Sequence, residues 1–201
     1  RLNLALKGLA LEDIPRPVEL RGKTAVVIGA GGIGLCVAER LNAFGMTVHT
    51  VSEDFIPIVN YIDKRFLSDQ ILDALPLADA VIVAAPWTKK SEAILNLETL
   101  RAMKGNSYLV NVSRGGLVST ADLVETLLSG HLSAVALDVT NPETLGEDHP
   151  LRHMANVVIT PHMAGISDNL RSRNFELIVT NIRRFSQGLP LINVADKIKG
   201  Y

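Results

Sequence analysis

Three charged side chains follow apolar segments in the second half of the chain, and together they could carry out acid–base chemistry on a substrate with a carboxylate. Arg114 comes soon after the run 109–112, and its guanidinium could bind a carboxylate through two parallel hydrogen bonds. His162 could transfer a proton, and an acid such as Glu143 beside it would favour the imidazolium and orient the ring. The sequence alone does not bring Glu143 and His162 together. The alternatives are a surface ion pair for Arg114 and ordinary loop positions for the other two.

A glycine pattern near the N-terminus predicts a dinucleotide site. The sequence Gly29-Ala30-Gly31-Gly32-Ile33-Gly34 follows the apolar run 24–28 and precedes a helical stretch. In the dinucleotide fingerprint, Gly29 allows a tight turn, Gly31 leaves room for a pyrophosphate, and Gly34 lets the helix pack close to the strand. The helix then directs free N–H groups at the phosphates. The alternative is a glycine-rich turn without a ligand, but strand, helix and second strand all stand where the fingerprint requires them.

The residue after the second strand bears on which dinucleotide binds. A carboxylate there accepts the ribose hydroxyls of NAD, but this position falls on Ser52, with Glu53 and Asp54 behind it. A serine leaves room for the 2′-phosphate of NADP, which also needs a cation, and only Lys64 or Arg65 could reach over from the third strand. Glu53 and Asp54 would repel that phosphate, unless they are simply solvated loop charges. The sequence therefore favours NAD slightly and leaves NADP open.

Strand and helix signals alternate from residue 24 onward, which predicts the scaffold that must position these residues. We predict strands at Thr24–Ile28, Thr47–Val51, Lys64–Phe66, Ala80–Ala84, Ser107–Val112, Ala134–Val139 and Asn156–Thr160. We predict helices at Ile33–Phe44, Gln70–Leu75, Leu97–Met103, Thr120–Leu128 and Ser167–Phe185. Such alternation is typical of an α/β fold with a doubly wound parallel sheet, here of six to seven strands with helices on both faces. Because ligands bind at the carboxyl ends of such strands, the polar candidates should share one rim.

Composition excludes several classes of partner. The chain has 201 residues, 47% of them hydrophobic, and 20 basic against 21 acidic side chains, so nothing indicates nucleic acid or a membrane surface. No apolar run approaches the roughly 18 residues of a membrane span, and no signal peptide is visible, so we expect a cytoplasmic protein. No Cys/His cluster has the spacing of a zinc site. The single cysteine, Cys36, is predicted to be a small core residue of the first helix.

With these motifs in place, the chain resembles the D-isomer-specific 2-hydroxyacid dehydrogenase family over nearly all of its length. The resemblance rests on four ordered motifs: Gly29 to Gly34, Leu109-Val110-Asn111-Val112-Ser113-Arg114-Gly115-Gly116, Ala136-Leu137-Asp138-Val139 with Glu143, and Thr160-Pro161-His162-Met163-Ala164-Gly165. It implies reduction of a small 2-keto acid such as glyoxylate or hydroxypyruvate with NAD(P)H. The alternatives are a dinucleotide-binding sensor or interaction module on the same scaffold, as in the C-terminal-binding-protein corepressors, and a methyl-donor binder.

The resemblance also implies roles for individual residues. Arg114 would bind the substrate carboxylate and polarise its carbonyl, His162 would protonate the carbonyl oxygen as hydride arrives, and Glu143 would be its carboxylate partner. Asp138 matches a residue near the nicotinamide amide, and Trp87 could line the substrate cleft, although a packing role is favoured. The expected cofactor contacts are Gly29, Gly31, Gly32, Ile33, Gly34, Ser52, Ala85, Pro86, Ser91, Val112, Ser113 and Asp138.

Enzymes of this family are longer than this chain, which leads to expectations about its domains. We expect residues 1–20 to be a linker or tail from a missing N-terminal substrate domain, 21–188 the dinucleotide-binding domain, and 189–201 a C-terminal tail. The isolated domain should then be inactive. The resemblance further implies a homodimer whose contacts come mostly from the cofactor domain.

Overall fold

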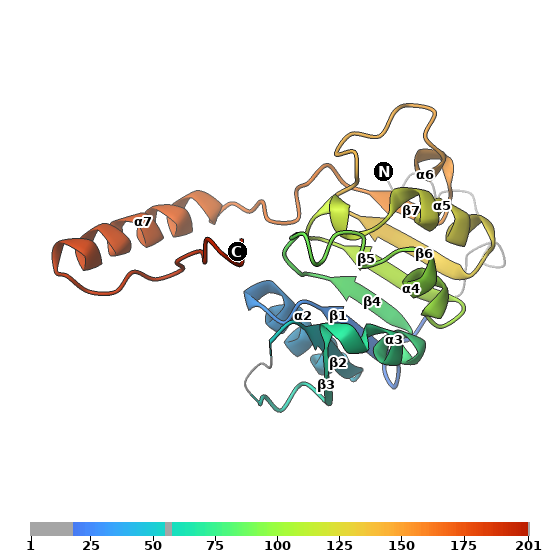
Figure 1. Cartoon of the computed structure of the whole chain (residues 1–201), viewed down its shortest axis with the longest axis horizontal. Coiled ribbons are helices and arrows are strands. Elements are labelled where there is room, and N and C mark those ends of the chain that lie inside the picture. The colour runs from blue at the N-terminus through green and yellow to red at the C-terminus, as the bar shows by residue number, and fades with distance from the viewer. Residues whose placement is uncertain (1–17, 55–57, 201) are drawn as a thin grey trace.

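A seven-stranded parallel sheet forms the centre of the structure, a computed structural model that describes residues 18–54 and 58–200 (Figure 1). The strands are β1 (Thr24–Ile28), β2 (Thr47–Ser52), β3 (Lys64–Leu67), β4 (Ala80–Val83), β5 (Ser107–Asn111), β6 (Leu132–Leu137) and β7 (Val157–Ile159). Their order is β3-β2-β1-β4-β5-β6-β7, and every neighbouring pair is parallel. The predicted doubly wound sheet is confirmed. The chain runs outward from β1 to β3 and then crosses back to β4, so the topological switch point lies between β1 and β4.

Helices cover both faces of this sheet. They are α2 (Gly32–Ala43), α3 (Ile71–Ala74), α4 (Leu97–Ala102), α5 (Thr120–Leu128) and α6 (Pro150–His153). A further helix, α7 (Leu170–Ser186), does not cover the sheet. The side chains of β1 show how the faces divide, because successive residues of a strand point to opposite sides. Val26 and Ile28 join the larger core cluster, which also contains residues of α3, α4, α5 and α6. Ala25 and Val27 join the smaller cluster under α2.

Three local expectations differ from the structure. Strand β6 begins at Leu132, two residues earlier than predicted, because buried Leu132 already pairs with Ser107 ahead of a bulge. The short helix α6 was not expected; its first backbone N–H groups include that of Leu151, which donates to His149 Nδ1 at 3.3 Å. Cys36 is exposed, so its predicted place in the core is wrong. The buried positions of α2 are Gly34 and Ala38, four residues apart on one face, and Cys36 lies on the other side.

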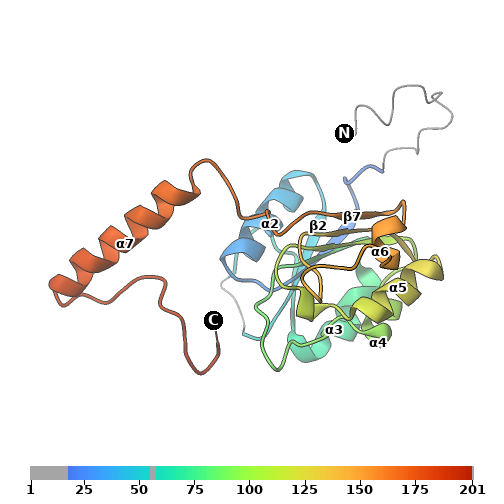
Figure 2. The same ribbon diagram turned by 90° about the horizontal axis from the view of Figure 1, so that it is seen from above.

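Helix α7 stands apart from the sheet. Figures 1 and 2 both show it projecting away from the other elements, after which the chain turns back toward them. None of its residues is buried, and its exposed apolar side chains include Phe175, Ile178, Ile182 and Phe185. The expected division at 21–188 places α7 in the dinucleotide-binding domain, and that division stays a prediction. Residues 1–17 of the expected linker lie outside the described residues.

Within residues 18–54 and 58–200, no helix is both long enough and apolar enough to cross a membrane.

Candidate active site

The turn between β1 and α2 is so tightly packed that two of its glycines cannot carry a side chain. Gly29 has a φ of +96°, and a Cβ there would lie 2.5 Å from the backbone of Ala85. A Cβ on Gly34 would lie 1.8 Å from the carbonyl oxygen of Gly29. The chain therefore passes directly from the carboxyl end of β1 into the first turn of α2, as the fingerprint requires.

The other two glycines of the turn face open space. A Cβ on Gly31 or Gly32 would meet nothing within 4 Å, and both residues line a cavity of about 680 Å³. The first N–H groups of a helix have no partner within the helix, so the start of α2 presents donors toward this cavity. The cavity lies at the switch point, between the residues that follow β1 and those that follow β4, and its volume is typical of a ligand site. The residues present therefore fit a dinucleotide with its pyrophosphate at the turn.

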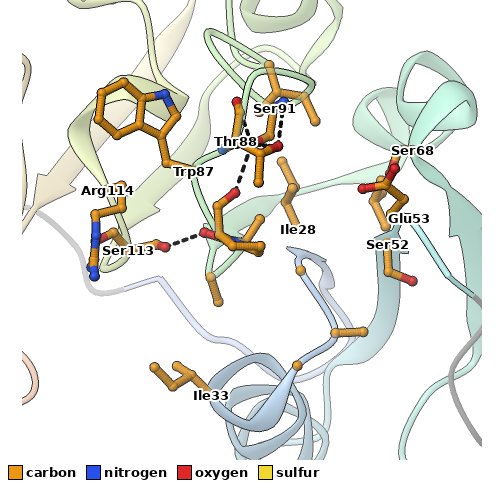
Figure 3. Close-up of a pocket in the computed structure, with 18 of the residues that line it drawn as sticks. Ile28, Ile33, Ser52, Glu53, Ser68, Trp87, Thr88, Ser91, Ser113 and Arg114 are labelled. Carbon is orange, nitrogen blue, oxygen red and sulfur yellow. Dashed lines mark hydrogen bonds between the residues drawn. The ribbon is translucent and has the colours of Figure 1, made fainter. Parts of the chain in front are cut away.

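Hydrogen bonds hold the loop after β4 against this cavity (Figure 3). Ser113 Oγ donates to the carbonyl of Ala85, and Ser91 Oγ donates to that of Pro86 at 2.8 Å. The backbone N–H of Thr88 donates to Ser91 Oγ at 2.9 Å. All of these residues line the cavity. Val112, also expected at the cofactor, is not among the lining residues, and its backbone N–H donates to Val83 at 3.3 Å.

The end of the larger cavity away from Ser113 is formed by the residues at the carboxyl end of β2. Ser52 is the last residue of β2, and its Oγ donates to the carbonyl of Asp54 at 2.6 Å. The cations suggested by the sequence are engaged elsewhere: Lys64 Nζ lies 4.4 Å from the centre of the Phe66 ring, and Arg65 donates to the carbonyl of Val59 at 3.3 Å.

Arg114 lies at the other side of the same cavity, beside Trp87 (Figure 3). The amide of buried Asn111 holds its loop, because Nδ2 donates to the carbonyl of Arg114 at 3.0 Å and Oδ1 accepts from the N–H of Ser113 at 3.1 Å. Arg114 is exposed, and its guanidinium donates to the carbonyl of Ser113 at 2.8 Å. Trp87 both lines the cavity and packs on Gly116, where a Cβ would lie 2.5 Å from its ring.

A second cavity, of about 380 Å³, contains the predicted acid–base pair. His162 Nδ1 and Glu143 Oε1 are 2.7 Å apart, and the two side chains are 48% and 60% exposed. The structure thus brings together two residues that the sequence could not. A carboxylate at Nδ1 orients the ring and leaves the other ring nitrogen, Nε2, to exchange a proton with a substrate.

Asp138 fastens the loop that carries His162. Its carboxylate accepts hydrogen bonds from Thr160 Oγ1, from the N–H of Met163 at 2.9 Å and from the N–H of Ala164 at 2.8 Å. Its backbone carbonyl accepts from the N–H of His162 at 2.9 Å. Burial alone would raise the pKa of Asp138, but the hydrogen bonds from the Thr160 side chain and from the backbone N–H groups of Ala164 and Met163, with the nearby His162, outweigh it and hold the pKa below its ordinary value. Asp138 lines the second cavity, with His162 and Glu143.

The loop of Glu143 packs against the loop of Arg114. A Cβ on Gly115 would lie 2.0 Å from the carbonyl oxygen of Thr140, so only glycine allows this approach. Thr140 Oγ1 in turn donates to the carbonyl of Pro142 at 2.8 Å, and Thr120 Oγ1 donates to that of Asn141 at 2.6 Å. The two glycines after Arg114 therefore serve different contacts, one with Trp87 and one with the Glu143 loop. Arg114 and His162 themselves line different cavities.

Comparison with known proteins agrees with this geometry. A model of the D-isomer-specific 2-hydroxyacid dehydrogenase NAD-binding domain matches residues 8–164. The chain belongs to this family. It is 36% identical over 171 residues to a glyoxylate reductase of Thermofilum pendens, covering 82% of this chain and 48% of that protein. It is 32% identical over 174 residues to the human glyoxylate reductase/hydroxypyruvate reductase, covering 86% of this chain and 52% of that one.

Solved structures of relatives have a similar fold. The NADPH-dependent glyoxylate/hydroxypyruvate reductase of Sinorhizobium meliloti, crystallised with NADP and sulfate, matches with a TM-score of 0.87 and 29% identity. That match covers 100% of this chain and 63% of that chain. The chain spans about half the length of the curated reductases it matches. It carries the family's cofactor-binding domain, which takes a nicotinamide dinucleotide.

Proposed function

We propose that this chain is the cofactor domain of an NAD(P)H-dependent reductase of small 2-keto acids, of the glyoxylate or hydroxypyruvate type. The observation that carries the proposal is the contact of 2.7 Å between His162 Nδ1 and Glu143 Oε1, made at the same rim of the sheet as the glycine turn. A sensor would need the glycine turn but has no use for an acid–base pair. Relatives that bear the names of such reductases add support.

The reaction needs a proton donor, a carboxylate binder and a hydride source. The bound dinucleotide would supply the hydride through its nicotinamide. Arg114 would hold the substrate carboxylate through two hydrogen bonds, exchanging its present contact with the carbonyl of Ser113 for the substrate. His162 would donate the proton from Nε2 to the carbonyl oxygen, and Glu143 at Nδ1 would stabilise the imidazolium before transfer. In the oxidation direction, the same residues would act in reverse.

The exposed surface of α7 supports the proposal that this domain works with further polypeptide. Its aromatic and aliphatic side chains, such as Phe175 and Phe185, lie in solvent along a helix with no buried residue. Apolar patches of this kind usually mark interaction surfaces. We propose that the substrate domain of the longer protein covers part of them, and that the whole enzyme is a homodimer.

The cofactor is proposed to be NAD or NADP. The sequence favours NAD slightly, through Glu53 and Asp54, whereas the Sinorhizobium meliloti reductase was crystallised with NADP. The serine at the end of β2 is compatible with either.

The test is turnover of glyoxylate and hydroxypyruvate by the full-length protein, with NADH and with NADPH. His162→Ala should lower kcat by roughly 100- to 10,000-fold while leaving the Kd of the reduced cofactor unchanged, because the side chain acts on the proton alone. His153→Ala is the matched control, since this exposed histidine contacts the carbonyl of Glu147 on another loop. Cofactor binding without turnover of any 2-keto acid would instead favour the sensor.

A further inference from the structure

The ribose end of the large cavity contains a part of the chain that lies far away in sequence. Besides Ser52, Glu53 and Asp54, the lining residues there include Gly200, next to the end of the chain. The segment after α7 turns back toward the sheet in both views of the molecule (Figures 1 and 2). Lys199 Nζ lies 2.8 Å from Asp54 Oδ2, which joins the C-terminal segment to the loop after β2.

Two lysines thus neutralise the two acids at this end. Lys90 Nζ pairs with Glu53 Oε1, and Lys199 Nζ pairs with Asp54 Oδ2. The four side chains together carry no net formal charge, whereas the sequence around β2 suggested two uncompensated carboxylates. A phosphate placed among them would meet two ammonium groups as well as two carboxylates, so the repulsion expected from Glu53 and Asp54 is largely cancelled.

The backbone around Lys199 is locally ordered by its own hydrogen bonds. Asp196 Oδ1 accepts from the N–H of Ile198 at 2.8 Å and from the N–H of Lys199 at 3.0 Å, and the N–H of Gly200 donates to the carbonyl of Asp196 at 2.8 Å. Further back, the amide of Asn181 on α7 makes two hydrogen bonds with the backbone of Ile192, at 3.0 and 2.9 Å. The segment that leads to the turn is therefore attached to α7 at Ile192, and the turn Asp196–Gly200 has hydrogen bonds of its own where it reaches the cavity.

We infer that the turn Asp196–Gly200 is part of the cofactor site and that Lys199 is a specificity-determining residue at the ribose 2′ position. When a 2′-phosphate is present, Lys199 shifts from Asp54 to the phosphate, or bridges both, and supplies the cation that NADP requires. When the ribose carries only a hydroxyl, Lys199 stays on Asp54 and contributes little. This inference rests on the proposed function only in that the cavity takes a nicotinamide dinucleotide.

The test measures binding, so it does not depend on catalysis. Lys199→Ala in the full-length protein should raise the Kd of NADPH and of adenosine 2′,5′-bisphosphate by roughly five- to tenfold. The effect is modest because the lysine side chain is half-exposed. The Kd values of NADH and adenosine 5′-monophosphate should change by less than about twofold, and Lys199→Arg should retain the affinity for NADPH. Lys104→Ala is the matched control, because this lysine also pairs with an aspartate, Asp79 Oδ1 at 2.6 Å, but does not line the cavity; it should leave the binding of all four ligands unchanged.

Two results would overturn the inference. If Lys199→Ala weakens the binding of NADH and of NADPH equally, the turn is a packing element without selectivity. If the binding of NADPH is unchanged, the turn is not part of the site. Failure of the full-length protein to reduce any 2-keto acid would sink the proposed function, yet a selective loss of NADPH binding would still support the role of Lys199.

Discussion

Replacing Asp138 with asparagine tests whether this carboxylate holds the loop that positions His162. In the structure its two oxygens accept from Thr160, Met163 and Ala164. An asparagine keeps one oxygen for two of these donors but turns an NH₂ group toward the third, so one charge-assisted hydrogen bond is lost and the other two become neutral. Each such bond contributes about 1.5–3 kcal/mol, and relief from burying a charge offsets part of the loss. We expect Asp138→Asn to lower the free energy of unfolding by about 2–3 kcal/mol at pH 7.

The same reasoning gives the sign of the pH dependence. Because the pKa of Asp138 is lowered in the folded state, its ionised form stabilises the fold. That contribution is complete above the unfolded pKa of about 3.9 and is lost as the pH falls through the lower, folded value. The difference in unfolding free energy between wild type and Asp138→Asn should therefore be constant from pH 7 to about 5 and shrink below about 4.

Urea denaturation of the full-length protein between pH 7 and 3 measures this difference, and hydrogen exchange at the amides of Met163 and Ala164 reports the loop directly. Asp73→Asn is the matched control, an exposed aspartate on α3. The reasoning is refuted if Asp138→Asn costs less than about 0.5 kcal/mol at pH 7, the range of an ordinary surface substitution. It is also refuted if the two loop amides keep their protection.

Four further substitutions test the rest of the site. Glu143→Gln should lower kcat, because the imidazolium loses its carboxylate. The limb of the pH–rate profile that reports the proton donor should move to lower pH, and an unmoved limb would refute the proposed pairing of Glu143 with His162. Arg114→Lys should raise KM for the keto acid and lower kcat, since lysine cannot make the two-pronged contact, and unchanged kinetics would give Arg114 a structural role only. Gly34→Ala should lower the free energy of unfolding by more than about 3 kcal/mol, because its Cβ would lie 1.8 Å from the carbonyl oxygen of Gly29. Gly31→Ala, whose Cβ would meet nothing, should fold normally and weaken cofactor binding. Equal stability of the two variants would contradict the packing argument.

Local sequence patterns were sufficient for the sheet and for the glycine turn. A buried parallel strand is a continuous apolar run, and the alternation of such runs with helical stretches predicts the doubly wound sheet that the structure has. The roles of Gly29 and Gly34 are also local, because each depends on the passage from β1 into α2. The exposure of Cys36 is also a local property, since Gly34 and Ala38 define the buried face of α2 and Cys36 lies off that face.

Contacts between loops could not be predicted in this way. The approach of Glu143 to His162 depends on the path of the chain after β6, which is set partly by the contact between Gly115 and Thr140. The glycines after Arg114 could have signalled close packing, but not with which partner. Lys199 is separated from Asp54 by 145 positions, so no spacing rule around β2 could have predicted that these two side chains pair.

The exposure of the proposed acid–base pair, His162 and Glu143, imposes a physical requirement on the proposed reductase. His162 and Glu143 are each about half-exposed, and in water their mutual attraction and their pull on a substrate are strongly weakened. Efficient proton and hydride transfer needs a site from which water is excluded, so a second wall must close over this rim. The chain after His162 leads directly to α7, whose apolar side chains are exposed, and from α7 to the turn that reaches the ribose end of the cavity. Polypeptide that packs on α7 would therefore be connected along the chain to the loop of His162 and, through the hydrogen bonds between Asn181 and Ile192, to the segment that leads to the C-terminal turn. Packing of further polypeptide over the rim and binding of the dinucleotide should then be positively coupled, each strengthening the other.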